Sequence, residues 1–297
     1  IITNQHVIAS GGPIHVSFAN GEQLPAELVG ADPYTDLALL KVIPDFRAEA
    51  FDLGDSSLCK KGEWVIAIGH SMGAEADGSV TVGVISSKDR TISMDVDKDG
   101  TDDWDMLVLQ TDAAINPGNS GGALVDDEGK LIGINTLITS YSGNYSGVGF
   151  AIPVNYAVNL AQQIIDGKTP THAQLGVSLS TVSAATASRY GLPVDTGAYV
   201  AAVTPDSGAA AAGIVPGDIV TAFDGQAVES ASDLMLDVRT KNPGDTVTLT
   251  VNSGGQEKEV QVTLGDDSAS QKAKQEQQSQ EQSMNGYSLE DLFGRQR

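Results

Sequence analysis

The sequence has little that would hold the chain together covalently, and it has little positive charge. Cys59 is the single cysteine among 297 residues, which excludes an intramolecular disulfide framework and is compatible with any cellular compartment. We expect it to be a small apolar filler rather than a reactive thiol. Lys and Arg number 17 against 39 Asp and Glu, giving a formal net charge of −22. Nucleic acids and anionic membrane surfaces are therefore poor partners.

Long apolar runs are also missing. No stretch approaches the roughly 20 residues that a membrane-spanning helix needs, and no secretory signal opens the sequence. Because "IITNQHVIAS" begins in the middle of a structural pattern, we expect upstream strands, and an anchor or signal, to be absent from this sequence. No cluster of His and Cys has the spacing of zinc ligands, and we expect no cofactor.

What the sequence does contain is a series of short β-type segments separated by turns, with 33 glycines. The first half holds "IHVSF", "LPAELVG", "DLALLKV", "WVIAIG", "SVTVGVIS", "MLVLQT", "KLIGINTLI" and "GVGFAI". Asn20-Gly21 between the first two predicts a hairpin turn. This spacing is typical of a mostly β barrel or sandwich.

A helix is predicted at the end of this half, before a linker at residues 166–173. Asn155 is its expected N-cap and Gly167 its terminator. The apolar residues between them have helical i, i+3, i+4, i+7 spacing: Ala157, Leu160, Ala161 and Ile164.

A second unit is predicted at residues 174–265, from the strands "LGVSLS", "GAYVAAV", "DIVTAFDG", "TVTLTV" and "KEVQVTL". Two short helices are expected between them, in "SGAAAAG" and "SASDLMLDVRT". Residues 266–297 are polar and Gln-rich, so they cannot bury a core and are predicted to be disordered.

The segment "INPGNSGGAL" places Ser120 among several glycines. A serine hydroxyl is a weak nucleophile near neutral pH, so catalysis needs a base, an orienter for that base, and donors for an oxyanion. Glycine lets backbone N–H groups converge on one small volume, and those of Gly118 and Ser120 are candidates for this role. From this motif alone, a glycine-rich β-turn without chemistry is the alternative.

Two further motifs favour the catalytic interpretation. "TNQHV" places His6 just after a strand, and "DPYTDLALLKV" places Asp36 at the start of an apolar strand. His6, Asp36 and Ser120 follow one of the known chain orders of the Ser-His-Asp triad. His6 would take the proton of Ser120 and return it to the leaving amine, while Asp36 would hold the imidazole tautomer.

These motifs, with "LQTDAAINPGNSGGALVDDEGKLIGINT" and "GVGFAIPVN", resemble the HtrA/DegP family of serine endopeptidases over almost all of residues 1–265. The resemblance implies a trypsin-like double β-barrel, N-terminally truncated here and spanning residues 1–165, followed by a PDZ domain. It also implies ATP-independent cleavage of unfolded or damaged proteins in quality control and stress response, outside the cytoplasm, by a homotrimer or a multiple of trimers.

The resemblance also implies which substrate residues are preferred at the cleavage site. The residue six before the nucleophile, at the base of the S1 pocket in trypsin-like proteases, is Ala114. An apolar floor would leave a buried cation unpaired, so small aliphatic P1 residues such as Val, Ala or Ile are expected. Asn119 stands where trypsin-like zymogens use Asp to bind a new N-terminal amine, so loop ordering is the expected switch that activates the protease.

In the second unit, "QLGVSL" resembles a PDZ carboxylate-binding loop, in which Leu175, Gly176 and Val177 would receive a peptide's C-terminus.

Alternatives remain for the whole chain and for one loop. The chain could be a peptide-binding chaperone or scaffold with silent or secondary proteolysis, or, as a weaker idea, a calcium-dependent surface adhesin. In "DVDKDGTDDWD" the residues Asp95, Asp97, Asp99 and Asp103 match the first part of a calcium loop, but Met106 stands where Glu is expected. A solvated acidic hairpin tip is favoured about two to one over a calcium site. His15, His70 and His172 are interpreted as surface or satisfied histidines.

Overall fold

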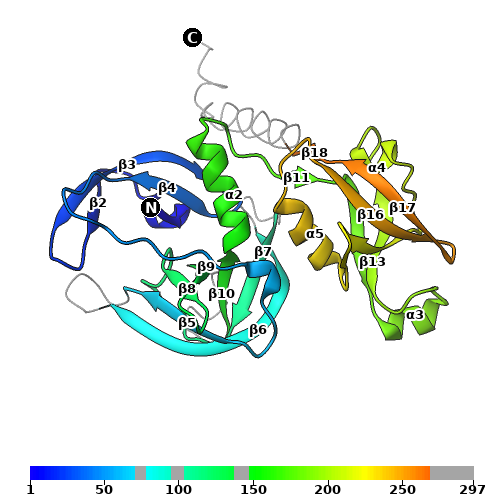
Figure 1. Ribbon diagram of the computed structural model, residues 1–297, viewed down its shortest axis with the longest axis horizontal. Coiled ribbons are helices and arrows are strands. Elements are labelled where there is room, and N and C mark those ends of the chain that lie inside the picture. The colour runs from blue at the N-terminus through cyan, green and yellow to red at the C-terminus, as the bar shows by residue number, and fades with distance from the viewer. Residues whose placement is uncertain (71–77, 95–103, 137–146, 268–297) are drawn as a thin grey trace, which may run out of the picture.

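The computed structural model describes residues 1–70, 78–94, 104–136 and 147–267. The chain forms two units side by side, a larger one containing residues up to the helix α2 and a smaller one that follows it (Figure 1). The architecture is mostly β, as the sequence predicts. None of the helices in the described ranges is long and apolar enough to cross a bilayer.

The first strands of the larger unit form a four-stranded sheet of order β1-β4-β3-β2. The strands are β1 (Ile2–Asn4), β2 (Ile14–Ser17), β3 (Gln23–Asp32) and β4 (Leu37–Lys41), with the short helix α1 (Gln5–Ile8) after β1. β2 and β3 pair antiparallel around Gly21, whose φ of 85° lies in the left-handed region. The hairpin predicted from Asn20-Gly21 is therefore confirmed.

The next six strands close into a barrel of order β10-β7-β6-β5-β8-β9. They are β5 (Trp64–Gly69), β6 (Ser79–Met94), β7 (Trp104–Thr111), β8 (Ala123–Val125), β9 (Leu131–Thr136) and β10 (Gly149–Pro153), preceded by the 3-10 turn η1 (Ser56–Leu58). Alternating side chains fill its interior, among them Val65, Ala67 and Leu109. Cys59 joins this core with a free thiol, and burial raises its pKa to about 11, so it packs as an unreactive apolar group.

The helix α2 (Val154–Ile165) covers the junction between the sheet and the barrel. Its apolar face buries Tyr156, Leu160 and Ile164, and Gly167 follows its end with a left-handed φ of 72°. The predicted N-cap is wrong: Pro153 caps the helix, and Asn155 lies inside it. The Asn155 side chain accepts a hydrogen bond from Ser56 N and donates one to Asp55, so it ties the helix to η1 instead.

The smaller unit is a five-stranded sheet of order β12-β13-β14-β16-β17, with β15 pairing on β14 and a separate β11-β18 pair. Its elements are β11 (Ala173–Gln174), β12 (Val177–Val182), α3 (Ala184–Tyr190), β13 (Gly197–Val203), α4 (Gly208–Ala211), β14 (Ile219–Phe223), β15 (Gln226–Ala227), α5 (Ala231–Arg239), β16 (Thr246–Ser253), β17 (Gln256–Thr263) and β18 (Gly265–Asp266). The two expected helices are α4 and α5. Sequence reasoning missed α3, although a Ser183–Thr186 capping box marks its start.

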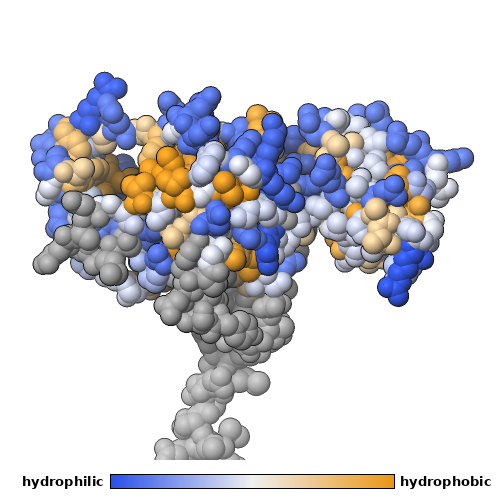
Figure 2. Space-filling model, turned by 90° about the horizontal axis from the view of Figure 1, so that it is seen from below, coloured by the Kyte–Doolittle hydropathy of each residue, from blue (hydrophilic) through white to orange (hydrophobic). Residues whose placement is uncertain are grey.

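The two units contact each other along α5 of the smaller unit and strands β6 and β7 of the larger (Figure 1). Thr91 and Ser232 share a hydrogen bond of 2.9 Å, and Lys88 Nζ lies 3.6 Å from Asp233 Oδ1. The face of the molecule seen from below carries apolar patches on the larger unit and more polar side chains on the smaller one (Figure 2). The Thr91–Ser232 and Lys88–Asp233 contacts between the two units are polar.

Candidate active site and peptide groove

His6 and Asp36, predicted to act together, are hydrogen-bonded. His6 lies on α1, and its Nδ1 is 2.7 Å from Asp36 Oδ2. The backbone N–H of His6 donates to the other carboxylate oxygen at 2.9 Å, so both oxygens hold the histidine. The hydrogen bond to Asp36 raises the pKa of His6, and partial desolvation opposes it. This pairing fixes the ring and leaves Nε2 available for proton transfer.

Asp36 lies in a tight turn between β3 and β4, and this turn positions its carboxylate. Asp36 itself has a φ of 55°, a left-handed conformation that is uncommon outside glycine. The backbone N–H of Thr35 donates to the Asp32 carboxylate at 3.2 Å and the Thr35 hydroxyl donates to the same oxygen, which closes the turn. Asn4 Nδ2 donates to the Asp36 carbonyl at 3.0 Å. The strained position is thus held from both sides.

A further partner of Asp36 was not identified from the sequence. Thr136, at the end of β9 and one hundred residues away, donates its hydroxyl to Asp36 Oδ2 at 3.1 Å. Asp36 Oδ2 therefore meets both the His6 ring and a buried hydroxyl. No local signal in "LIGINT" marks this role, because it depends on the closure of the barrel against the first sheet.

Ser120 lies in the loop between β7 and β8, beside the start of α1. Gly118 has a φ of 103°, as expected for a backbone that turns its N–H groups inward. Gly121 approaches so closely that a Cβ there would stand 2.2 Å from Thr3 Oγ1, which places the serine loop against the strand that leads to His6. No described hydrogen bond joins the Ser120 hydroxyl to the His6 ring; catalytic hydrogen bonds are often long before substrate binds.

Ser120 and Gly118 also line one cleft of about 720 Å³, together with His70 and apolar residues such as Phe51 and Ile134. His70 N donates to Gly118 O at 3.3 Å, so the strand end at Gly69 supports the serine loop. The structure therefore pairs His6 with Asp36 and places the serine loop, with its open cleft, against the strand that precedes His6.

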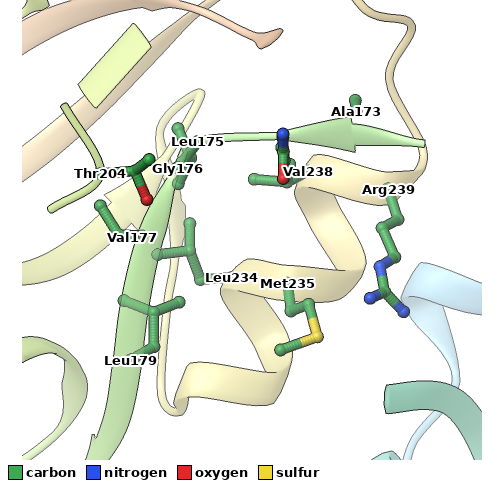
Figure 3. A pocket seen from close by; sticks show the side chains of 11 residues that line it. Ala173, Leu175, Gly176, Val177, Leu179, Thr204, Leu234, Met235, Val238 and Arg239 are labelled. Carbon is green, nitrogen blue, oxygen red and sulfur yellow. The ribbon is translucent and has the colours of Figure 1, made fainter. Parts of the chain in front are cut away.

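The smaller unit carries a groove of about 210 Å³ between β12 and α5. All three predicted loop residues, Leu175, Gly176 and Val177, line it, and Leu234 and Val238 of α5 form the opposite wall (Figure 3). Gly176 has a φ of 78°, and a Cβ there would stand 2.2 Å from Ser207 Cβ, so glycine is required. Sequence reasoning did not single out two lining residues of the groove, Thr204 and Arg239.

Comparison with known proteins identifies a domain in each of the two units. Residues 1–134 match the trypsin-like peptidase domain and residues 173–264 match the PDZ domain. The solved structure "HtrA-type protease AlgW with tripeptide" is 38% identical, covers 89% of this chain and 85% of its own, and superposes with a TM-score of 0.62. The structure of AlgW with a decapeptide gives the same identity over 78% of its chain, with a TM-score of 0.58.

The chain belongs to the HtrA family of serine endoproteases.

Curated HtrA relatives are similar over the same region. A probable periplasmic serine endoprotease DegP-like from Halomonas elongata is 43% identical over 92% of this chain and 55% of its own length. The serine protease Do-like HtrA of Lactobacillus helveticus is 38% identical over 89% of this chain and 64% of its own. The chain thus spans between half and two-thirds of the length of these two relatives.

The residue expected at the base of the HtrA S1 pocket is only partly exposed. The carbonyl of Ala114 accepts hydrogen bonds from Thr81 Oγ1 at 2.9 Å and from Asn119 Nδ2 at 3.3 Å. Asn119 is fully buried, so its amide fixes the chain between Ala114 and the serine.

The remaining candidates in this HtrA chain divide into two groups. Asp95, Asp97, Asp99 and Asp103 lie outside the described residues, whereas Met106 is a buried core residue of β7. The described ranges contain no group of three or more His, Cys, Asp or Glu that could hold a metal ion. Of the isolated histidines, His172 is buried and hydrogen-bonded to the Tyr156 hydroxyl at 2.6 Å.

Proposed function

We propose that this chain is a serine endopeptidase in which Ser120 is the nucleophile, His6 the general base and acid, and Asp36 the group that orients His6. The observation that carries the proposal is the double contact of Asp36 with His6 beside the serine loop. The hydrogen bond at Nδ1 leaves Nε2 as the acceptor of the Ser120 proton. His6 then gives that proton to the leaving amine.

The N–H groups of Gly118 and Ser120 are the proposed oxyanion donors. The left-handed φ of Gly118 supports this role, because such a backbone turns successive N–H groups toward one point. Donors of this kind stabilise the negative charge of the tetrahedral intermediate, and losing one typically lowers turnover by about 10²–10³-fold.

The proposed substrates are unfolded or damaged proteins, cleaved without ATP after small aliphatic residues. Ala114 offers no carboxylate to a basic P1 side chain, so Arg or Lys there would be buried without a partner. Related proteins are named as periplasmic endoproteases, which supports an extracytoplasmic location. A homotrimer, or a multiple of trimers, is the proposed assembly.

The groove between β12 and α5 is the proposed receptor for exposed C-terminal peptides. A peptide would add as a strand along Val177–Leu179 while its terminal carboxylate meets the loop at Leu175–Val177. The apolar walls made by Leu179, Leu234 and Val238 favour an apolar last residue (Figure 3). The related protease AlgW has been solved with a tripeptide and with a decapeptide, which supports peptide binding in this family.

The test is incubation of the purified chain with a permanently unfolded protein in the absence of ATP, followed by mass-spectrometric mapping of the cleavage sites. We expect cuts after Val, Ala and Ile that are absent with Ser120→Ala. A folded sample that protects the unfolded protein from aggregation without cutting it would favour the chaperone alternative. Cuts after Arg or Lys would refute the specificity assigned to Ala114.

A further inference from the structure

A buried histidine lies where the two units join. His172 stands immediately before β11 and is 2% exposed. Its backbone N–H donates to Asp267 Oδ1 at 2.8 Å, and its ring packs 4.8 Å from that of Trp104 on β7. The guanidinium carbon of Arg239, on α5, lies over the Trp104 ring, 4.1 Å from the ring centre. One side chain thus touches segments from both units.

The two ring nitrogens of His172 face different groups. Nδ1 lies 2.6 Å from the Tyr156 hydroxyl, and burial raises the pKa of that tyrosine, which therefore remains a hydrogen-bond donor. The tautomer that accepts this hydrogen bond carries its proton on Nε2. Nε2 approaches Asp32 Oδ2 to 3.3 Å and Asp267 Oδ2 to 3.9 Å, close enough for electrostatic attraction, although neither contact is aligned as a hydrogen bond. The imidazole therefore stands between two buried carboxylates.

Asp32 is the residue that closes the turn carrying Asp36. The oxygen that faces His172 is the same Oδ2 that accepts from the Thr35 N–H and hydroxyl. Its other oxygen accepts from Tyr34 N at 3.3 Å. A shift of this carboxylate would loosen the turn, and Asp36 is the next residue along the chain after Thr35. A continuous series of contacts therefore links His172 at the junction of the units to Asp36, through Asp32 and Thr35.

We propose that His172 is a positioning residue of the active site, which holds the Asp32 carboxylate and through it the turn that presents Asp36 to His6. The inference rests on the proposed function and assigns a role in it to a residue outside the triad. Without the imidazole, the Asp32 and Asp267 carboxylates would lose the polar Nε2 edge that lies beside both of them. A buried carboxylate that loses a polar neighbour is destabilised, so the Asp32 carboxylate would shift from its position in the turn.

Three variants of the full chain test this role. His172→Ala removes both ring contacts, and His172→Gln restores an amide N–H near the position of Nε2. Gln163→Ala is the matched control, because Gln163 is equally buried and clamps the neighbouring Thr171 backbone through bonds of 2.9 and 3.0 Å without contacting Asp32. Turnover of a peptide substrate gives kcat and KM. Carbon-13 NMR of labelled histidine gives the pKa of His6 without requiring activity.

We expect His172→Ala to lower kcat about tenfold with KM unchanged, the effect of a small misplacement of a catalytic group. The pKa of His6 should fall in the same variant, because its raised value depends on the hydrogen bond to Asp36. His172→Gln should recover part of both quantities, and Gln163→Ala should change neither.

A wild-type kcat and an unchanged pKa of His6 in His172→Ala would overturn the inference while leaving the proposed function intact. Equal losses in His172→Ala and Gln163→Ala would overturn it too, since the effect would then be one of linker packing. If the wild-type chain cleaves nothing, the proposed function fails. The pKa of His6 in the same variants still decides whether His172 positions Asp36.

Discussion

The two units place their functional groups in opposite ways. In the trypsin-like unit, His6, Asp36 and Thr136 come from distant parts of the chain and meet through side chains. In the PDZ unit, the proposed carboxylate site consists of three consecutive residues, Leu175–Val177, whose backbone N–H groups would bind the peptide. The first site therefore depends on how large elements pack against each other, whereas the second depends on local backbone conformation.

Removing the charge of Asp36 should show the largest effect and should be confined to the trypsin-like unit. Asp36→Asn is expected to lower kcat about 10⁴-fold, because the imidazole would lose its oriented tautomer and its counter-charge. Thr136→Val removes one hydrogen bond and should lower kcat only about tenfold. Steady-state kinetics measures both, with binding of a fluorescent C-terminal peptide as the control. A comparable loss of peptide binding would contradict the separation of the two sites.

The converse change is Gly176→Ala, which should damage only the PDZ unit. The added Cβ would stand 2.2 Å from Ser207 Cβ at a φ of 78°, so the loop must shift, at a cost of about 1–3 kcal/mol. Peptide affinity should fall at least tenfold in a titration, while cleavage of a short peptide continues. Gly213→Ala is the control, because φ is 75° there but a Cβ would meet nothing within 4 Å. Equal losses in both variants would mean that backbone strain alone is responsible.

The trypsin-like unit and the PDZ unit should also differ in their dependence on pH. The hydrogen bond to Asp36 raises the pKa of His6 above its ordinary value of 6.5, and His6 must be neutral to act as a base. The plot of kcat/KM against pH should therefore rise with a midpoint above 6.5, and Asp36→Asn should move that midpoint down. Peptide binding to the PDZ unit should not follow this curve. A wild-type midpoint at or below 6.5 would contradict the His6–Asp36 pairing.

The smallest effect is expected at the contact between the units. Burial, and then the neighbouring Asp233, raise the pKa of Asp237 on α5 from 3.8 to about 6. The Asp237 carboxyl group therefore binds its proton more tightly in the folded state than in the unfolded chain. The free energy of unfolding falls as pH rises between these two pKa values. Asp237→Asn should remove that decline and stabilise the protein at pH 7 by about 1 kcal/mol, after a discount for partial exposure. Denaturant unfolding at pH 4 and pH 7 measures the difference; parallel pH profiles in the two proteins would contradict it.

The sequence alone allowed the mostly β architecture, the Asn20-Gly21 hairpin and the pairing of His6 with Asp36 to be predicted. These rest on local signals: alternation, turn residues and short motifs around each functional side chain. Thr136, and the contact of His172 with Asp32, carry no such signal, because each joins elements that meet only after folding. The same reason explains Asn155, a good local N-cap that the structure uses to hold η1 instead.

Covalent labelling of the folded chain with a fluorophosphonate, followed by mass spectrometry of the modified peptide, tests the proposed triad directly. We expect a single adduct on Ser120, formed slowly in Asp36→Asn and absent in Ser120→Ala. No labelling of the folded wild-type chain, or an adduct on a different serine, would contradict a triad of Ser120, His6 and Asp36.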